Sequence, residues 1–213
     1  MKKLYREADI IRFIKEGKTE LVVDKDTILT PSAIDMINSA KMKIVPAPTA
    51  AAEAAGCGGN GKEFSKIVVG GDHTGYNAKK VIIKLLKEKG YEVLDIGTNS
   101  EDSCDYPDFA FIAAAKIINK EACAAILIDA TGIPSAIAAN KFPGIRAATC
   151  YNEFSAKSSR EHNNANIMVV GAMALGIETI KSITNTWLNS KFLGERHQRR
   201  LDKITEVEKK LLK

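Results

Sequence analysis

The chain has 213 residues, of which 45% are hydrophobic and 27% charged, and its formal net charge is +5. These proportions are typical of a soluble globular protein and exclude a mainly disordered or collagen-like chain. No run of about 18 consecutive apolar residues occurs, so we expect no membrane-spanning helix, and the N-terminal residues do not resemble a secretory signal.

The first 45 residues are predicted to form a small α+β module. Residues 4–15 have the periodicity of an amphipathic helix. Its apolar stripe consists of Leu4, Ala8, Ile11 and Ile14. Residues 21–23 and 43–45 are predicted strands. Thr30 followed by Pro31 predicts a cap and first turn for a helix that ends near Ala40.

A linker is predicted next. Residues 46–63 are rich in Ala, Gly and Pro and contain no large apolar side chain. Such a segment buries too little surface to offset its ordering entropy. We therefore expect a module at 1–45, a flexible linker at 46–64 and a main domain at 65–213.

The main domain alternates between predicted strands and helices. The strands lie at 66–70, 91–96, 124–128, 146–150 and 167–170. The helices lie at 77–89, 109–119, from 135 onward, 155–161, 177–188 and 199–212. This alternation indicates βαβ units and predicts an α/β fold, a doubly wound, Rossmann-like sheet of five parallel strands. Ligands bind beyond the carboxyl ends of such strands, so the loops at 71–76, 97–108, 129–135 and 151–154 are candidate sites.

Polar residues in three segments at the ends of these elements suggest catalytic chemistry. Asp72 and His73 follow the first strand, in a Gly-rich loop that favours an anion. Asp129 follows the third strand and is either a general base or the cap of the next helix. His162 at a helix end is either an acid–base group or a C-terminal cap.

The remaining charge and the cysteines restrict the ligand class. Residues 191–213 contain eight Lys/Arg and four Asp/Glu, and therefore hold +4 of the net +5. A compact basic tail with the sequence RHQRR indicates a phosphate or a solvated helix, rather than a nucleic-acid surface. None of the four cysteines lies in a CxxC pair, which argues against a structural zinc site. We expect reduced thiols and a cytoplasmic location.

Six segments in order resemble one family. They are GGDHTGY, IGTNSEDSCDYPDFA, ATGIPSAIAANK, GIRAATCYN, SREHNNANIMVVG and ERHQRRLDKI, between residues 66 and 204. Together they resemble the ribose-5-phosphate isomerase B and galactose-6-phosphate isomerase family. The resemblance implies a metal-free and cofactor-free interconversion of aldose and ketose phosphates through an enediolate. It also implies a homodimer or tetramer with a shared active site, a phosphorylated sugar as ligand, and neither nucleic acid nor membrane as partner.

The resemblance also implies roles for individual residues. The implied catalytic residues are Asp129, Thr131 and His162. The implied substrate-binding residues are Asp72, His73, Tyr106, Ala130, Gly132, Ile133, Pro134 and Asn163, with the backbone of 130–134 holding the enediolate. The implied phosphate-binding residues are Arg196 and Arg200, which reach the neighbouring subunit's site.

The chain differs from the family at the position of the catalytic base. Asp129 replaces the usual Cys, and Ser135 stands where another branch has Glu. Met173 replaces an arginine, and Ala130 and Pro134 replace glycines of the loop. A carboxylate shielded from water serves as base in other enediolate isomerisations, so catalysis by Asp129 is compatible with this chemistry. The alternative is a catalytically degenerate subunit that binds sugar phosphate and complements a paralogue.

The N-terminal segment suggests a targeting role. Residues 27–45, TILTPSAIDMINSAKMKIV, resemble short segments of proteins associated with bacterial microcompartments. A helix that docks into a groove of a shell protein would direct the chain there as cargo. The alternative is an ordinary accessory or dimerisation module.

Overall fold

The computed structural model describes residues 3–23, 27–46 and 63–211. The chain divides into two compact units, within residues 1–56 and 57–213. Most of the predicted linker, residues 47–62, lies outside the described residues. Glu63 and Phe64, at its predicted end, belong to the larger unit, where Phe64 is buried. Within the described residues, no helix has the length and apolar character needed to cross a membrane.

The smaller unit consists of two successive strand–helix–strand segments. Its elements are β1 (Lys3–Tyr5), α1 (Glu7–Lys15), β2 (Glu20–Val23), β3 (Thr27–Leu29), α2 (Pro31–Ser39) and β4 (Lys43–Pro46). β1 pairs in parallel with β3, and β2 with β4. Both helices have nine residues, and each is followed by a residue with positive φ, Gly17 at 74° and Lys41 at 52°. The two halves are therefore local repeats of one conformation.

The first helix differs from the sequence prediction. The predicted helix over 4–15 is wrong at its start, because Leu4 lies in β1 and α1 begins at Glu7. The buried residue of α1 is Ile10, whereas Ala8 is exposed and Ile14 is 36% exposed. α1 packs against α2, so the partner helix decides which side of α1 is covered.

The second helix is confirmed. The hydroxyl of Thr30 accepts a hydrogen bond from the Ala33 amide at 3.3 Å, and Pro31 occupies the first turn. The fixed φ of Pro suits that position, where its missing N–H is not needed. The helix ends at Ser39, with Ala40 as its C-cap.

The larger unit is the predicted α/β domain. Its strands are β5 (Lys66–Gly71), β6 (Glu92–Asp95), β7 (Ala124–Asp129), β8 (Ala147–Thr149) and β9 (Ile167–Gly171). Its helices are the 3₁₀ helix η2 (His73–Gly75), α4 (Tyr76–Glu88), α5 (Tyr106–Ile118), α6 (Pro134–Ala139), α7 (Glu153–Glu161), α8 (Ile177–Asn189) and α9 (Glu195–Leu211). The strands form one parallel sheet in the order β6-β5-β7-β9-β8. The five-stranded parallel sheet is thus confirmed.

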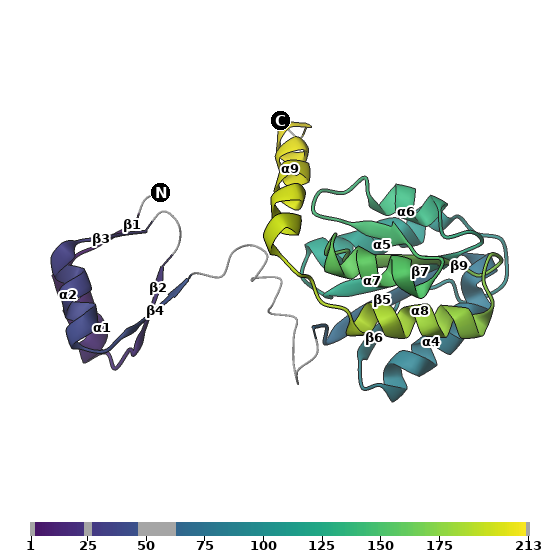
Figure 1. Ribbon diagram of the computed structural model, residues 1–213. Helices are drawn as coiled ribbons and strands as arrows, with labels where there is room; N and C mark the ends of the chain where they lie inside the picture. The colour runs from purple at the N-terminus through teal and green to yellow at the C-terminus, as the bar shows by residue number, and fades with distance from the viewer. Residues whose placement is uncertain (1–2, 24–26, 47–62, 212–213) are drawn as a thin grey trace. The chain divides into compact units, whose positions relative to one another are not determined.

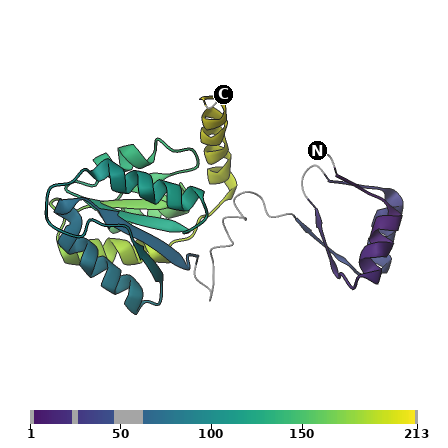
Figure 2. The same ribbon diagram turned by 180° about the vertical axis from the view of Figure 1, so that it is seen from behind.

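Helices cover both faces of this sheet, as Figures 1 and 2 show. One buried cluster joins α4, α7 and α8 to alternate strand residues such as Ile126 and Met168. The other joins α5 and α6 to the intervening residues, such as Leu127 and Val169, and its helical members are alanines. Small side chains allow these two helices to lie close to the sheet. Burial on both faces explains the apolar runs of β5, β7 and β9, whereas the edge strands β6 and β8 are only partly buried.

Two helix starts and one cysteine differ from expectation. α5 begins at Tyr106, three residues before the predicted start at 109, because Pro107 fits the first helical turn. α9 begins at Glu195, directly after Gly194 with φ 67°. Cys104 and Cys150 are free thiols, but Cys123 is disulfide-bonded, so the expectation that all thiols are reduced is wrong.

Candidate active site

Asp72 directly follows β5, and Asp129 is the last residue of the neighbouring strand β7, on the side of β5 opposite to β6. β5 and β7 are neighbours, and their register pairs Gly71 with Ile128. Asp72 and Asp129 therefore follow adjacent strand ends, on strands about 4.8 Å apart. Both side chains are buried, with 6% and 0% exposure. This carboxyl edge of the sheet is the position at which open α/β sheets bind ligands.

Asp129 is held by the loop that follows it. Its Oδ1 accepts hydrogen bonds from the amides of Thr131, at 2.9 Å, and Gly132. Its Oδ2 accepts a hydrogen bond from the Ser135 amide at 3.0 Å. Three backbone donors at a helix start form an anion site, and the Asp129 carboxylate occupies it. The helix-capping interpretation of Asp129 is therefore present in the structure, alongside its position at the strand end.

The shape of the loop depends on close backbone contacts. Gly132 has φ 83°, and its carbonyl accepts a hydrogen bond from the Thr149 hydroxyl at 2.6 Å. A Cβ on Gly171, which lies opposite Asp129 in β9, would come within 2.4 Å of the Thr131 carbonyl carbon. Sequence analysis did not select Thr149 or Gly171. The signal available for Gly171 was a glycine that directly follows a buried strand.

The other residues of this loop differ in exposure. The Met173 amide donates to the Ala130 carbonyl at 3.0 Å, which ties the loop to the residues after β9. Pro134 begins α6, and the Ile133 side chain is 49% exposed. Thr131 is also exposed, and its hydroxyl accepts from the Ile133 amide at 3.3 Å. Thr131 and Ile133 are therefore the parts of the loop most accessible to a ligand.

The first loop holds its side chains in a similar way. Asp72 Oδ1 accepts from the amide and the hydroxyl of Thr74, at 2.9 and 2.6 Å, and more weakly from the Gly75 amide. The Cys104 amide donates to His73 Nδ1 at 3.2 Å. His73 Nδ1 also lies 3.3 Å from the Cys104 carbonyl oxygen, so the Cys104 backbone fixes the orientation of this ring. Tyr106, at the start of α5, lies at the same edge of the sheet because its helix follows β6.

The remaining predicted residues lie at the opposite, amino edge of the sheet. α7 starts beyond the carboxyl end of β8 and runs back across the sheet, so His162 and Asn163 follow its far end. α9 begins there too, since the Leu193 amide donates to the Glu161 carbonyl at 3.0 Å. Arg196 and Arg200 lie in the first turns of α9, and both are exposed.

A histidine that sequence analysis did not assign contacts His162. The rings of His162 and His197 stack with centroids 4.4 Å apart and planes 6° apart. His162 Nδ1 lies 3.1 Å from the Ser158 hydroxyl, and Arg196 Nε donates to His197 Nε2 at 3.4 Å. Burial lowers the pKa of His197, and the neighbouring His162, Arg196 and Arg200 lower it further, while the Glu195 carboxylate opposes this effect. The sequence RHQRR contained this histidine, but only the fold places it against His162.

Within one chain the predicted site residues thus form two separate groups. The carboxyl-edge group contains Asp72, His73, Tyr106 and the loop 129–135. The amino-edge group contains His162, Asn163, Arg196 and Arg200. A central strand of five residues spans about 16 Å, so a small sugar phosphate bound at one edge does not reach the other.

The comparisons with known proteins identify the domain. The model of the Ribose/Galactose Isomerase family matches residues 67–204. The chain belongs to this family. Over 147 residues it is 42% identical to ribose-5-phosphate isomerase B of Escherichia coli strain K12, which covers 69% of this chain and 99% of the relative. The larger unit is accordingly the isomerase domain, and the smaller unit lies outside the family match.

Solved structures agree with this assignment. Ribose-5-phosphate isomerase B of Clostridium thermocellum superposes with a TM-score of 0.68 at 48% identity, covering 68% of this chain and 99% of its own. A Mycoplasma genitalium ribose-5-phosphate isomerase B, solved with bound ribulose-5-phosphate, gives a TM-score of 0.65 at 40% identity, with 68% and 96% coverage. The isomerase domain of this chain is therefore an aldose–ketose isomerase domain with the fold of these enzymes.

Proposed function

We propose that this chain interconverts an aldose phosphate and a ketose phosphate through an enediolate, with a pentose phosphate of the ribose 5-phosphate type, or a related pentose or hexose phosphate, as substrate. The observation that carries the proposal is the buried carboxylate of Asp129 at the end of the central strand, in a domain that matches ribose-5-phosphate isomerases over nearly their whole length. A carboxylate next to an array of backbone donors is the pair of groups that enediolate chemistry requires.

Asp129 is the proposed base. It removes the proton from C2 of the aldose, and the electron pair forms the C1–C2 double bond while O1 takes the negative charge of the enediolate. The hydroxyl proton of O2 then passes to O1, the Asp129 carboxylic acid returns its proton to C1, and C2 becomes the carbonyl carbon of the ketose. To do so the carboxylate must turn away from the amides of Thr131, Gly132 and Ser135. The released amides then face the substrate side and can hold the enediolate oxygen. Thr131 contributes through its backbone and its exposed hydroxyl.

The neighbouring side chains bind the sugar in this proposal. His73 contacts the sugar through Nε2 in this proposal, because the Cys104 backbone occupies Nδ1. Asp72 uses Oδ1 to hold its own loop, which leaves Oδ2 for a hydroxyl. Tyr106 and the segment from Ala130 to Pro134 line the same edge of the sheet.

We infer that a second copy of the chain completes the site. His162, which assists ring opening, Asn163, which binds a hydroxyl, and Arg196 and Arg200, which bind the phosphate, lie at the amino edge of their own sheet. Only another subunit can bring them to the carboxyl edge. The exposed apolar face of α9 supports such an arrangement; its members are Ile204, Val207 and Leu211. A homodimer, or a tetramer built from such dimers, follows.

One observation favours a second candidate function. Asp129 is 0% exposed, and both of its carboxylate oxygens are already bound by backbone amides. A carboxylate that never leaves these donors would act as a structural anion. The chain would then be a degenerate subunit that binds sugar phosphate without turnover and complements an active paralogue.

Proton exchange in D₂O distinguishes the two candidates. The protein is incubated with pentose and hexose phosphates, and NMR follows deuterium at C1 and C2. Ketose formation with deuterium incorporation, lost in Asp129→Asn, supports the isomerase with Asp129 as base. Full activity in Asp129→Asn rejects Asp129 as base. Saturable binding without exchange, restored by a partner chain, supports the degenerate subunit.

For the smaller unit we propose a docking role. It forms a compact unit outside the family match and exposes the apolar side chains Ile14, Ile34 and Ile44. A microcompartment shell protein is the proposed partner, and the cytoplasm or the microcompartment interior the proposed location. Residues 1–56 fused to a fluorescent protein should concentrate in microcompartments; diffuse fluorescence would contradict this role.

A further inference from the structure

The turn that follows α7 carries one of the proposed substrate contacts, Asn163, and begins directly after another, His162. This turn consists of residues 163–165 and is called the 163–165 turn below. Asn164 in its middle has φ 44°, a left-handed conformation that asparagine adopts more readily than most residues other than glycine. The Asn164 amide donates to the Arg160 carbonyl at 3.0 Å, and the Ala165 amide to the Ser159 carbonyl at 2.9 Å, so the backbone of the turn is tied to the end of α7. The position of His162 and Asn163 therefore depends on what fixes this turn.

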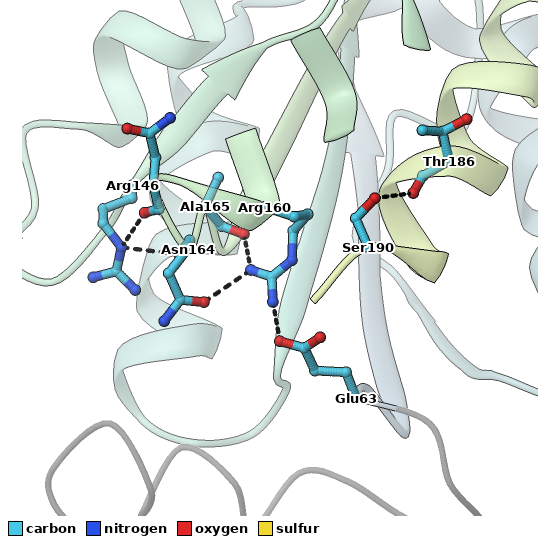
Figure 3. Close-up of polar contacts among 8 residues, drawn as sticks. Glu63, Arg146, Arg160, Asn164, Ala165, Thr186 and Ser190 are labelled. Carbon is cyan, nitrogen blue, oxygen red and sulfur yellow. Dashed lines mark hydrogen bonds and ion pairs between the residues drawn. The ribbon is translucent and has the colours of Figure 1, made fainter. Parts of the chain in front are cut away.

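Two arginines hold the 163–165 turn from both sides, as Figure 3 shows. Arg146 Nε donates to the carbonyls of Asn163 and Asn164, at 3.1 and 2.9 Å. Arg160 Nη1 donates to the Asn164 side-chain carbonyl at 3.1 Å and to the Ala165 carbonyl. Arg160 is 1% exposed, so these bonds lie away from water, where they are stronger.

Arg160 is itself fixed by residues far away in the sequence. Its guanidinium carbon lies 4.7 Å from the centre of the Phe64 ring and 5.4 Å from that of Trp187, and these two rings stack on each other. Arg160 Nη2 forms an ion pair with Glu63. Burial lowers the pKa of Arg160, and the charge of Glu63 opposes that effect. Glu63 thus balances a buried charge that would otherwise be costly.

The partner of Arg160 comes from outside the family match. Glu63 and Phe64 precede Ile67, at which the match begins. We propose that Glu63 and Arg160 are positioning residues: the ion pair orients the guanidinium, whose other nitrogen sets the 163–165 turn and with it the affinity of this half-site for sugar phosphate. The inference rests on the proposed contacts of His162 and Asn163 with substrate. A residue that precedes the family match thereby tunes the substrate-binding step of the isomerase domain.

Substitution of Glu63 tests the proposal. Glu63→Ala removes the acceptor, whereas Glu63→Gln keeps an acceptor oxygen and removes the charge. We expect KM to rise about tenfold in Glu63→Ala with kcat within about threefold, because the loss falls on substrate binding. Glu63→Gln should lie between Glu63→Ala and the unmodified chain. Glu178→Gln is the matched control, since Glu178 pairs with Lys181 at 2.7 Å on an exposed surface.

Arg160→Lys provides a second variant. It keeps the positive charge but lacks the planar guanidinium group, two of whose nitrogens contact Glu63 and the turn. Its KM should therefore rise at least as much as that of Glu63→Ala. A lowered thermal midpoint with unchanged KM in Glu63→Ala would show that the pair only stabilises the fold, and would overturn the proposal.

Two readouts do not require turnover. The dissociation constants of the pentose and hexose phosphates used in the exchange experiment are measured by calorimetry, and the side-chain amide resonance of Asn163 by NMR. If the unmodified chain binds a sugar phosphate but does not convert it, the isomerase proposal fails. A larger dissociation constant and a shifted Asn163 resonance in Glu63→Ala would in that case still support the positioning role. If neither quantity changes in Glu63→Ala, the positioning role is rejected. No binding by the unmodified chain rejects both proposals.

Discussion

Removing one oxygen from the Asp129 carboxylate should destabilise the isomerase domain strongly. Asp129 is fully buried, and its two oxygens accept from three backbone amides. In Asp129→Asn, the remaining oxygen can keep the amides of Thr131 and Gly132. The new NH₂ group then faces the Ser135 amide, so that two donors oppose each other and neither has a partner.

The size of the effect follows from this geometry. A hydrogen bond to a charged group contributes about 1.5–3 kcal/mol, and an unpaired buried donor costs about 1–3 kcal/mol. Since these terms overlap, we expect a loss of about 3 kcal/mol in the free energy of unfolding. For a domain of this size the thermal midpoint then falls by about 6–12 °C.

Thermal and urea unfolding of Asp129→Asn and of a control variant measure this loss of stability. Asp105→Asn is the control, because Asp105 is exposed and its side chain makes no capping hydrogen bond at the start of α5. The control should change the free energy of unfolding by no more than about 0.5 kcal/mol. An Asp129→Asn midpoint equal to that of the control would mean that the loop does not depend on the carboxylate, and would refute the anion-site description.

Three further predictions concern other parts of the chain. The pKa of His197 in the folded chain lies below its ordinary value of 6.5, so between the two pKa values the unfolded chain binds more protons than the folded one. The free energy of unfolding should therefore fall as the pH drops from 6.5 toward the folded pKa. His197→Gln should flatten this pH dependence in thermal scans at pH 5 to 7. Gly71→Ala would place a Cβ 1.9 Å from the Ile128 carbonyl oxygen, so urea unfolding should show a loss above about 3 kcal/mol, whereas Gly176→Ala, with open space around it, should cost about 1 kcal/mol or less. In the smaller unit, Ile10→Ala should cost about 2–5 kcal/mol and Ile14→Ala about 0.5 kcal/mol or less; equal protection of amides from hydrogen exchange in the two variants would contradict the observed burial.

The amino-acid sequence by itself determined the features that depend on near neighbours. The Thr30-Pro31 cap needs only four consecutive residues, and the structure confirms it. Apolar runs of strand length predicted β5, β7 and β9, because strands buried on both faces must be continuously apolar, and the partly buried β6 and β8 were predicted from shorter segments between helices. The position of Asp72 and Asp129 at strand ends followed from the same runs, and the six motifs identified the family.

Only the tertiary structure decided the features that depend on residues distant in the sequence. Ile10, rather than Ile14, is buried because of where α2 lies. His162 lies at the edge of the sheet opposite Asp129 because α7 runs back across it, which no local pattern reports. Glu63 pairs with Arg160 across 97 positions of the sequence. Such contacts arise from packing and chain direction, so a periodicity read over a few residues cannot contain them.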